Sequence, residues 1–286
     1  MPMTKLLLCT DLDRTLLPNG EAPEHPAARP LFSKLCALPE VTLAYVSGRH
    51  LPLVEEAINE FAIPQPDYII SDVGTRIYQP AASGWQELSA WQERIAVDWR
   101  GKTPEKLQQA IGERPVLSLQ EAEKQNRFKL SYYVSLPVDS DELLDWVANQ
   151  LDPLEVFFNL VWSVNEVAGL GLLDVIPRSA SKLHAIEFLQ QYLQPSPPLT
   201  VFAGDSGNDL PVLISAIPAV LVANATPVLQ QQVQQLAQMK GTADALYLAR
   251  DDQSPLGGNY SAGILQGVAH FSPQYADWLK QAGELP

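Results

Sequence analysis

The chain has 286 residues, of which 46% are hydrophobic and 18% are charged, and its formal net charge is −14. The length allows a large core and two domains. The acidic balance argues against a nucleic-acid partner, whose phosphates need a basic surface. An anionic substrate would need a metal ion or a few Lys and Arg side chains in its site.

The first hydrophobic run, residues 6–9, is too short for a signal sequence or a membrane span. Two cysteines, Cys9 and Cys36, give no disulfide framework, which is typical of a reducing compartment. We therefore expect a cytoplasmic monomer that does not bind membranes.

The first third of the sequence alternates between strand and helix patterns. Strands are predicted at 6–10, 42–46 and 68–71, and helices at 27–38 and 51–61. This alternation is typical of a parallel sheet with right-handed crossover connections.

After Gly84 the pattern changes. Residues 85–113 are helix-like, a strand is predicted at 129–136, an amphipathic helix at 141–151, and further strands at 155–162 and 172–176. Helices followed by consecutive strands indicate a small α+β domain. Strand and helix patterns alternate again from Ser181. We predict that the chain leaves its first domain (1–83 and 178–286) to build a second one at 84–177.

Two carboxylates, Asp11 and Asp13, follow the first hydrophobic run. Removing a carboxylate from water is costly, so a pair at the end of a buried strand suggests a cation or a reaction. Side chains at positions i and i+2 can converge on a hard ion if the chain turns there and one residue supplies a carbonyl. The alternative is an ordinary acidic loop.

Other hydrophobic segments also end in small or acidic polar groups. The strand at 41–46 is followed by Ser47-Gly48-Arg49, Lys182 begins an amphipathic helix, and the run at 199–203 is followed by Gly204-Asp205-Ser206-Gly207-Asn208-Asp209. In an open parallel sheet, ligands bind beyond the carboxyl ends of the strands. These residues are therefore expected to meet in one crevice.

In this order, the segments resemble the motifs of the haloacid dehalogenase (HAD) superfamily of phosphohydrolases. Asp11-Leu12-Asp13-Arg14-Thr15-Leu16 is similar to the first motif, DxDx[TV]; Ser47 and Lys182 match the second and third, and 204–209 matches the fourth, GDxxxD. The resemblance implies an α/β fold: a Rossmann-like parallel-sheet core with an inserted C2-type α+β cap at 84–177. Partial matches at 72–78, 128–132 and 260–271 resemble the sucrose-phosphate phosphatase family.

The resemblance implies roles for the acidic residues. Asp11 would be the nucleophile that forms an aspartyl-phosphate, and Asp13 the general acid and base. Mg²⁺ would be held by Asp11, Asp205 and the backbone carbonyl of Asp13. Asp209 would hold a metal-bound water or cap the following helix, and Lys182 would neutralise the charge that develops during transfer.

A phosphate oxygen could accept hydrogen bonds from the hydroxyl and backbone N–H of Ser47. Gly48 would let the backbone come close, and the helix that follows favours an anion. Arg49 is better placed to meet the rest of the substrate. Asn208 would orient Lys182 or the phosphate, or cap its helix.

Residues Lys129 and Ser131 alternate with hydrophobic residues, so they share one face of a strand. That face could bind sugar hydroxyls or form a solvent-facing edge. Three features depart from the sucrose-phosphate phosphatase pattern: Ser47 in place of Thr, Arg14 where Gly or Asn is frequent, and the stretch 166–171 in place of a more acidic one.

The expected ligand is a small sugar phosphate, and the expected reaction is hydrolysis of sucrose 6-phosphate or a similar disaccharide phosphate. Alternatives are a phosphatase for mannosyl- or glucosylglycerate phosphate or for hexose phosphates, and a phosphomannomutase-like enzyme. A non-catalytic sugar-phosphate sensor is a third possibility, against which the complete set Asp11, Asp13, Ser47, Lys182 and Asp205 argues.

Overall fold

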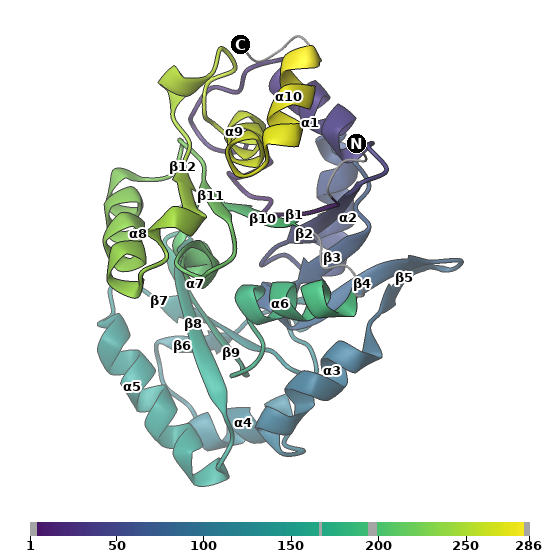
Figure 1. The fold of residues 1–286 in the computed structure, drawn as a ribbon. Helices are drawn as coiled ribbons and strands as arrows, with labels where there is room; N and C mark the ends of the chain where they lie inside the picture. The colour runs from purple at the N-terminus through teal and green to yellow at the C-terminus, as the bar shows by residue number, and fades with distance from the viewer. Residues whose placement is uncertain (1–4, 166–167, 194–198, 283–286) are drawn as a thin grey trace.

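A computed structural model describes residues 5–165, 168–193 and 199–282 (Figure 1). Its larger sheet has eight strands in the order β12-β11-β10-β1-β2-β3-β4-β5. Neighbours from β12 to β3 are parallel, and β4 and β5 continue the sheet as antiparallel strands. The strands are β1 (Leu6–Thr10), β2 (Val41–Val46), β3 (Tyr68–Ser71), β4 (Arg76–Ala81), β5 (Gly84–Glu87), β10 (Leu199–Gly204), β11 (Ala219–Leu221) and β12 (Leu246–Leu248).

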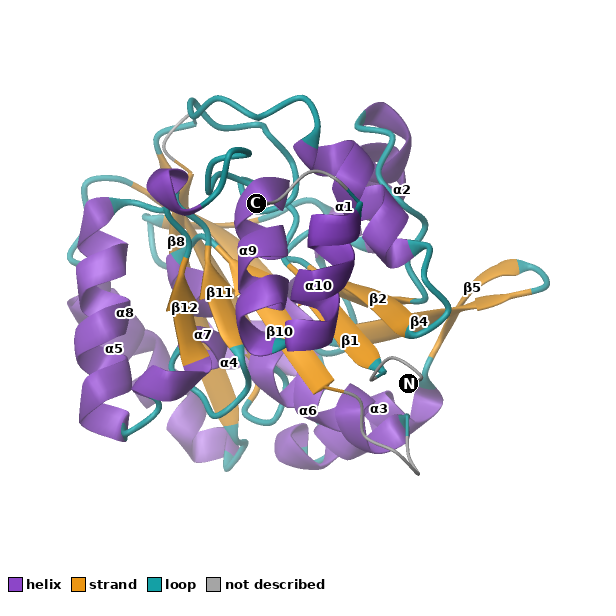
Figure 2. Ribbon diagram, turned by 45° about the horizontal axis from the view of Figure 1, so that its top comes forward, coloured by secondary structure: helices purple, strands orange, loops and turns teal. Residues whose placement is uncertain are grey.

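Helices cover both faces of this sheet. Alternate residues of β1 belong to different hydrophobic clusters, Leu6 and Leu8 to one and Leu7 and Cys9 to the other, as expected for a strand that is buried on both faces. Figure 2 shows α1, α9 and α10 in front of β1 and β10. The helices are α1 (Ala28–Cys36), α2 (Leu51–Glu60), α9 (Ser261–Phe271) and α10 (Pro273–Gln281) with the first cluster, and α6 (Lys182–Tyr192), α7 (Leu210–Leu213) and α8 (Pro227–Lys240) with the second.

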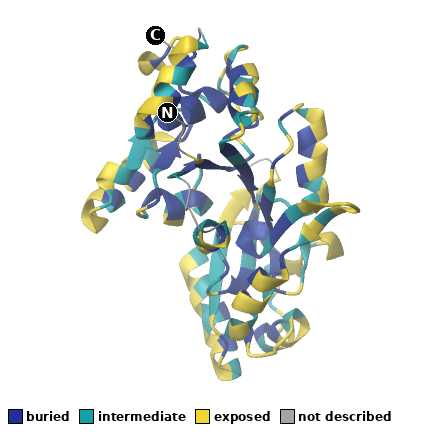
Figure 3. Cartoon of the chain, turned by 45° about the vertical axis from the view of Figure 1, so that its right-hand side comes forward, coloured by how far each residue is buried: buried dark blue, intermediate teal, exposed yellow. Residues whose placement is uncertain are grey.

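The inserted segment forms a second, antiparallel sheet in the order β6-β7-β9-β8. Its hydrophobic residues continue the cluster that contains Leu7, and Figure 3 shows buried residues in both parts of the molecule. We call this part the cap. Its elements are α3 (Ser89–Ala96), α4 (Pro104–Ile111), β6 (Leu117–Leu119), β7 (Leu130–Ser135), α5 (Ser140–Leu151), β8 (Phe158–Asn165) and β9 (Leu170–Pro177).

The predicted segments at 85–113 and 155–162 differ from the observed elements. The first contains α3 and α4, but it begins within β5, which pairs with β4 in the larger sheet. The second is displaced toward the C-terminus, where β8 spans Phe158–Asn165. The strand Gly84–Glu87 thus lies in the core sheet, although the predicted boundary assigns it to the cap; the division at 84–177 stays a prediction. In the described part of the chain, we find no helix long and hydrophobic enough to cross a membrane.

Candidate active site

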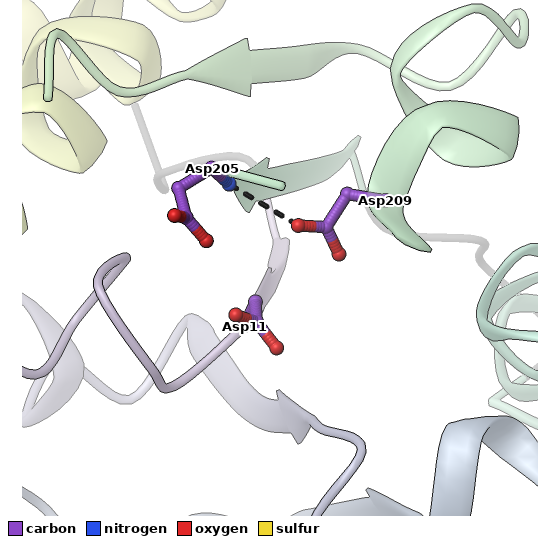
Figure 4. A group of neighbouring side chains, drawn as sticks. All are labelled: Asp11, Asp205 and Asp209. Atoms are coloured by element: carbon purple, nitrogen blue, oxygen red, sulfur yellow. Dashed lines mark hydrogen bonds between the residues drawn. The ribbon is translucent and has the colours of Figure 1, made fainter. Parts of the chain in front are cut away.

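The polar residues that follow β1, β2 and β10 converge because these three strands are adjacent and parallel. Asp11 follows β1, and Asp205 and Asp209 follow β10. Their carboxylates face one another in Figure 4, and one oxygen from each lies within 4.8 Å of the others. The predicted crevice at the carboxyl ends of the strands is therefore present.

Lys182, the first residue of α6, is buried against this acidic cluster. Its Nζ donates to Oδ1 of Asp11 at 2.8 Å, to Oδ1 of Asp209 at 2.6 Å and to Oδ1 of Asn208 at 3.1 Å. Burial by itself lowers the pKa of Lys182, but Asp11 and Asp209 outweigh that effect and raise it. The ammonium therefore stays charged. Asn208 helps to orient it, which is one of the roles that we expected for Asn208.

Asp209 is bonded through both carboxylate oxygens to other groups of the protein. Its Oδ2 accepts the backbone N–H of Asp205 and of Ser206, each at 3.1 Å, which forms a capping box with Ser206. A Cβ on Gly204 would lie 2.6 Å from Cγ of Asp209, so glycine is required for this approach. Asp209 therefore completes a capping box of the short turn 207–209, whose N-cap is Ser206, whereas its side chain makes no cap hydrogen bond to α7, the helix that we considered. Its contact with a metal-bound water stays a prediction.

Burial raises the pKa of two of the three clustered carboxylates. The pKa of Asp205 rises to about 6 and that of Asp11 to about 8, and Asp209 contributes to both by repulsion. When all three carboxylates are ionised, they and the Lys182 ammonium sum to a charge of −2. Carboxylate oxygens are ligands for hard divalent cations, so Asp11, Asp205 and Asp209 form a cluster that fits such a metal ion.

Asp13 is held by Arg49 and by Asn19. Nε of Arg49 donates to Oδ2 of Asp13 at 2.8 Å, an Nη of Arg49 donates to Oδ1 at 2.6 Å, and Nδ2 of Asn19 donates to Oδ1 at 2.7 Å. Burial raises the pKa of Asp13, but the hydrogen bonds and charge of Arg49 outweigh it, so the net shift is downward. The Asp13 side chain is therefore ionised in this conformation.

Ser47 follows β2, and its hydroxyl oxygen accepts the backbone N–H of Arg49 at 3.1 Å. The backbone N–H of Ser47, which we expected to reach a phosphate, instead donates to the carbonyl of Ile70 at 2.8 Å. That part of the expectation is wrong, because the N–H continues the pairing of β2 with β3. Gly48 has open space around its Cα and lines the cavity described next.

A cavity of about 520 Å³ separates these residues from the cap. Its lining includes Asp11, Asp13, Arg14, Gly48, Arg49 and Asp205 from the core, and Gln120, Lys124, Lys129, Tyr133 and Asp174 from the cap. The cap thus closes the side of the crevice opposite the acidic cluster.

On the cap side, Lys129 and Ser131 are both buried, which excludes the solvent-facing alternative. Nζ of Lys129 lies 3.6 Å from Oδ1 of Asp72 and 3.9 Å from Oδ1 of Asp174. The Ser131 hydroxyl donates to Asp174, and burial raises the pKa of that carboxyl. Lys129 and Ser131 thus lie on the same face of the strand, as predicted. The Ser131 hydroxyl is occupied there by its hydrogen bond to the Asp174 carboxylate.

The turn after β3 joins the cap to the catalytic loops. The N–H of Asp72 donates to the carbonyl of Arg49 at 3.0 Å, and the N–H of Val73 donates to that of Ser47 at 3.2 Å. A Cβ on Gly74 would lie 2.4 Å from the backbone carbon of Ser181. The predicted site residues did not include this turn or Asn19. The sequence of the turn was noted only as a partial match to the family. Asn19 lies in a Pro-Asn-Gly run, which by itself indicates only a turn.

The family model for sucrose-6F-phosphate phosphohydrolase matches residues 4–272. The chain belongs to this family. A sucrose-phosphatase from Synechocystis sp., solved in complex with sucrose and phosphate, is 26% identical with a TM-score of 0.73, covering 94% of this chain and 98% of that one. The predicted HAD phosphatase fold with a cap is thereby confirmed.

Two curated relatives agree with the sucrose-6F-phosphate phosphohydrolase assignment. A protein of Nitrosococcus oceani named as a HAD-like hydrolase is 45% identical over 98% of this chain and 75% of its own length. Mannosylfructose-phosphate phosphatase of Agrobacterium fabrum is 28% identical over 77% of this chain and 84% of its own length. The protein is thus a sugar phosphatase of the HAD superfamily, a phosphoric monoester hydrolase.

Proposed function

We propose that this phosphatase hydrolyses sucrose 6-phosphate or a closely similar disaccharide phosphate in a Mg²⁺-dependent reaction. The observation that supports this most directly is the contact between Lys182 and Asp11, because Asp11 lines a cavity whose opposite wall is the cap. A fixed ammonium beside a carboxylate suits the transfer of an anionic phosphoryl group to that carboxylate.

Asp11 is the proposed nucleophile, attacking through Oδ2. Its Oδ1 accepts from Lys182 at 2.8 Å, whereas within the described part of the chain the hydrogen bond to Oδ2 is a long one from the Thr15 hydroxyl, at 3.4 Å. Attack by Oδ2 on phosphorus forms the aspartyl-phosphate and breaks the bond between phosphorus and the sugar oxygen. Water then attacks phosphorus, the bond to Oδ2 breaks, and inorganic phosphate leaves.

Asp13 is the proposed proton donor to the sugar oxygen, and it then accepts the proton of the attacking water. Because Arg49 keeps Asp13 ionised in this conformation, protonation requires the Arg49 guanidinium to turn away, toward the substrate.

Mg²⁺ is proposed to be held by Asp11 and Asp205, with Asp209 close by, and to offset the repulsion between the nucleophile and the phosphate. Their hard oxygen ligands and the local charge of −2 fit this ion.

The cap wall favours a neutral sugar over a leaving group that has a second charge. The Lys129 ammonium can donate hydrogen bonds to a sugar and the Asp174 carboxylate can accept them, and at 3.9 Å apart their charges offset each other. Lys124 is paired with Glu121 at 3.0 Å. Such mixed donors and acceptors suit sugar hydroxyls. A glycerate carboxylate would need an unpaired cation there, so we favour the disaccharide phosphates over the glycosylglycerate phosphates.

Phosphate release from a panel of sugar phosphates, with Mg²⁺ or with EDTA, tests the proposal. The panel contains sucrose 6-phosphate, mannosylfructose phosphate, glucosylglycerate phosphate and simple hexose phosphates. We expect stoichiometric phosphate from a disaccharide phosphate, only with Mg²⁺, and none from Asp11→Asn. Isomerised sugar phosphate would indicate a mutase, and wild-type activity in Asp11→Asn would disprove the mechanism.

A further inference from the structure

Arg14 has a backbone conformation that is unfavourable for an arginine. Its φ is +56°, in the left-handed region that glycine and asparagine tolerate best. The backbone is fixed there on both sides: its N–H donates to Oδ1 of Asn19 at 2.8 Å, and its carbonyl accepts from Nδ2 of Asn224 at 2.6 Å. Because the backbone is held, only the side chain is free to move.

The guanidinium of Arg14 reaches a carboxylate of the metal-binding cluster. Its Nε lies 3.1 Å from Oδ2 of Asp205, and the Arg14 side chain is 48% exposed whereas that of Asp205 is 3% exposed. The other oxygen of Asp205 accepts from the Thr15 hydroxyl at 3.2 Å. Arg14 thus covers the cavity side of a buried carboxylate and could leave it without disturbing the core.

The charges indicate competition between Arg14 and a divalent ion. In their ionised forms, Asp11, Asp205 and Asp209 together with the Lys182 ammonium sum to −2, which one divalent cation neutralises. With Arg14 paired to Asp205 the sum is −1, and a divalent cation would then leave the site positive. A guanidinium has only donors and cannot act as a metal ligand, so it either shares Asp205 at the expense of the ion or moves away.

We propose that Arg14 is a built-in competitor of the metal ion at Asp205. In the metal-free protein the guanidinium neutralises this carboxylate, and it swings into the cavity when the ion binds. The affinity for the ion is therefore lower than the carboxylates alone would give. This inference rests on the proposed function in one respect, namely that the cluster binds Mg²⁺.

Calorimetric titration of the substrate-free full-length protein with Mg²⁺ tests this directly. Arg14→Gly and Arg14→Asn remove the guanidinium and suit the positive φ. Ion pairs with a half-exposed partner such as Arg14 contribute little, so we expect the dissociation constant for Mg²⁺ to fall by about two- to fivefold. The rise in melting temperature on adding Mg²⁺ should also be larger in both variants than in the wild type.

Arg100→Gly is a matched control. Arg100 also has a positive φ, +47°, is 49% exposed at its side chain, and pairs with Glu155 at 3.4 Å in the cap. Replacing it relieves the same backbone strain and removes the same charge, so its affinity for Mg²⁺ should equal that of the wild type. Asp205→Asn should abolish the binding signal, which would show that the titration reports this site.

The possible results separate the inference from the proposed function. Unchanged or weaker Mg²⁺ binding in both Arg14 variants, with normal binding in the wild type, would overturn the competition alone. Tighter binding in Arg100→Gly as well would also overturn it, since the effect would then come from net charge or stability. No Mg²⁺ binding by the wild type, together with phosphatase activity in EDTA, would instead reject the Mg²⁺ dependence itself.

Discussion

Asp209→Asn distinguishes a structural carboxylate from a metal ligand. Asp209 is fully buried; one of its oxygens accepts two backbone N–H groups and the other accepts the Lys182 ammonium. An asparagine side chain has a single oxygen, so it can satisfy only one of these two sides. Its NH₂ group would then face either the ammonium or the two backbone donors.

The loss can be estimated from these contacts. Removing one partner of a buried ion pair costs about 3–5 kcal/mol. Asp11 and Asn208 still accept from Lys182, and the repulsion that Asp209 exerts on Asp11 and Asp205 disappears. Both effects reduce the cost, so we expect the free energy of unfolding to fall by about 2–3 kcal/mol.

Urea unfolding in excess EDTA is the appropriate assay, because it excludes any contribution of a bound metal. The matched control is Asp205→Asn, which caps no backbone and replaces a carboxylate whose pKa burial raises, so we expect its stability in EDTA to equal or exceed that of the wild type. If Asp209→Asn also unfolds at the wild-type urea concentration in EDTA, and loses only its response to Mg²⁺, then Asp209 is a metal ligand and our reasoning is wrong.

Two further predictions concern the acidic cluster and the cap. Because burial raises the pKa of Asp205 to about 6 from 3.8, the folded state holds a proton that the unfolded state releases between about pH 4 and 6. The Asp205 contribution to metal-free stability should therefore fall by up to about 3 kcal/mol over that window as the pH rises, and Asp11, whose pKa is also raised, changes stability in the same direction. Mg²⁺ should raise the melting temperature more at pH 8 than at pH 5, and equal rises would contradict this. In the cap, Lys129→Met should raise KM for the preferred sugar phosphate about tenfold or more, as expected when a hydrogen bond from a charged group is lost. An unchanged KM for every sugar phosphate tested would contradict a role of Lys129 in sugar binding. Lys124→Met provides the comparison, because Lys124 lines the same cavity but its ammonium is held more closely, donating to the Tyr133 hydroxyl at 2.6 Å and lying 3.0 Å from Glu121, whereas the nearest carboxylate oxygen to Lys129 is at 3.6 Å.

The parts of the fold that could be predicted are those determined by local hydrophobic patterns. The buried runs at 6–10 and 68–71 coincide with β1 and β3. A short continuous hydrophobic run between polar ends is typical of a buried strand, so the pattern was sufficient to predict both. The strand Gly84–Glu87 could not be predicted in this way. Its four residues are partly or fully exposed, and only Trp85 among them packs against a hydrophobic cluster, so its position depends on pairing with β4.

The same distinction applies to the active site. The convergence of Asp11 with Lys182 and Asp205 follows from the order of parallel strands, so the motifs were sufficient to predict it. The ion pair of Arg14 with Asp205 depends on a side-chain conformation, which a sequence pattern does not specify. The backbone N–H of Ser47 was misassigned for a related reason, because whether a donor is free depends on the neighbouring strand.

Because of the turn at 72–74, we expect sugar recognition and phosphoryl transfer to be coupled in this protein. Asp72 faces the cap through Lys129, while its own N–H holds the carbonyl of Arg49, the residue that keeps Asp13 ionised. A sugar hydroxyl that draws Lys129 away from Asp72 therefore changes the surroundings of Asp72, whose own N–H is hydrogen-bonded to the Arg49 carbonyl. For this reason a Lys129 variant should lower kcat as well as raise KM, whereas a residue that only contacts sugar would change KM alone.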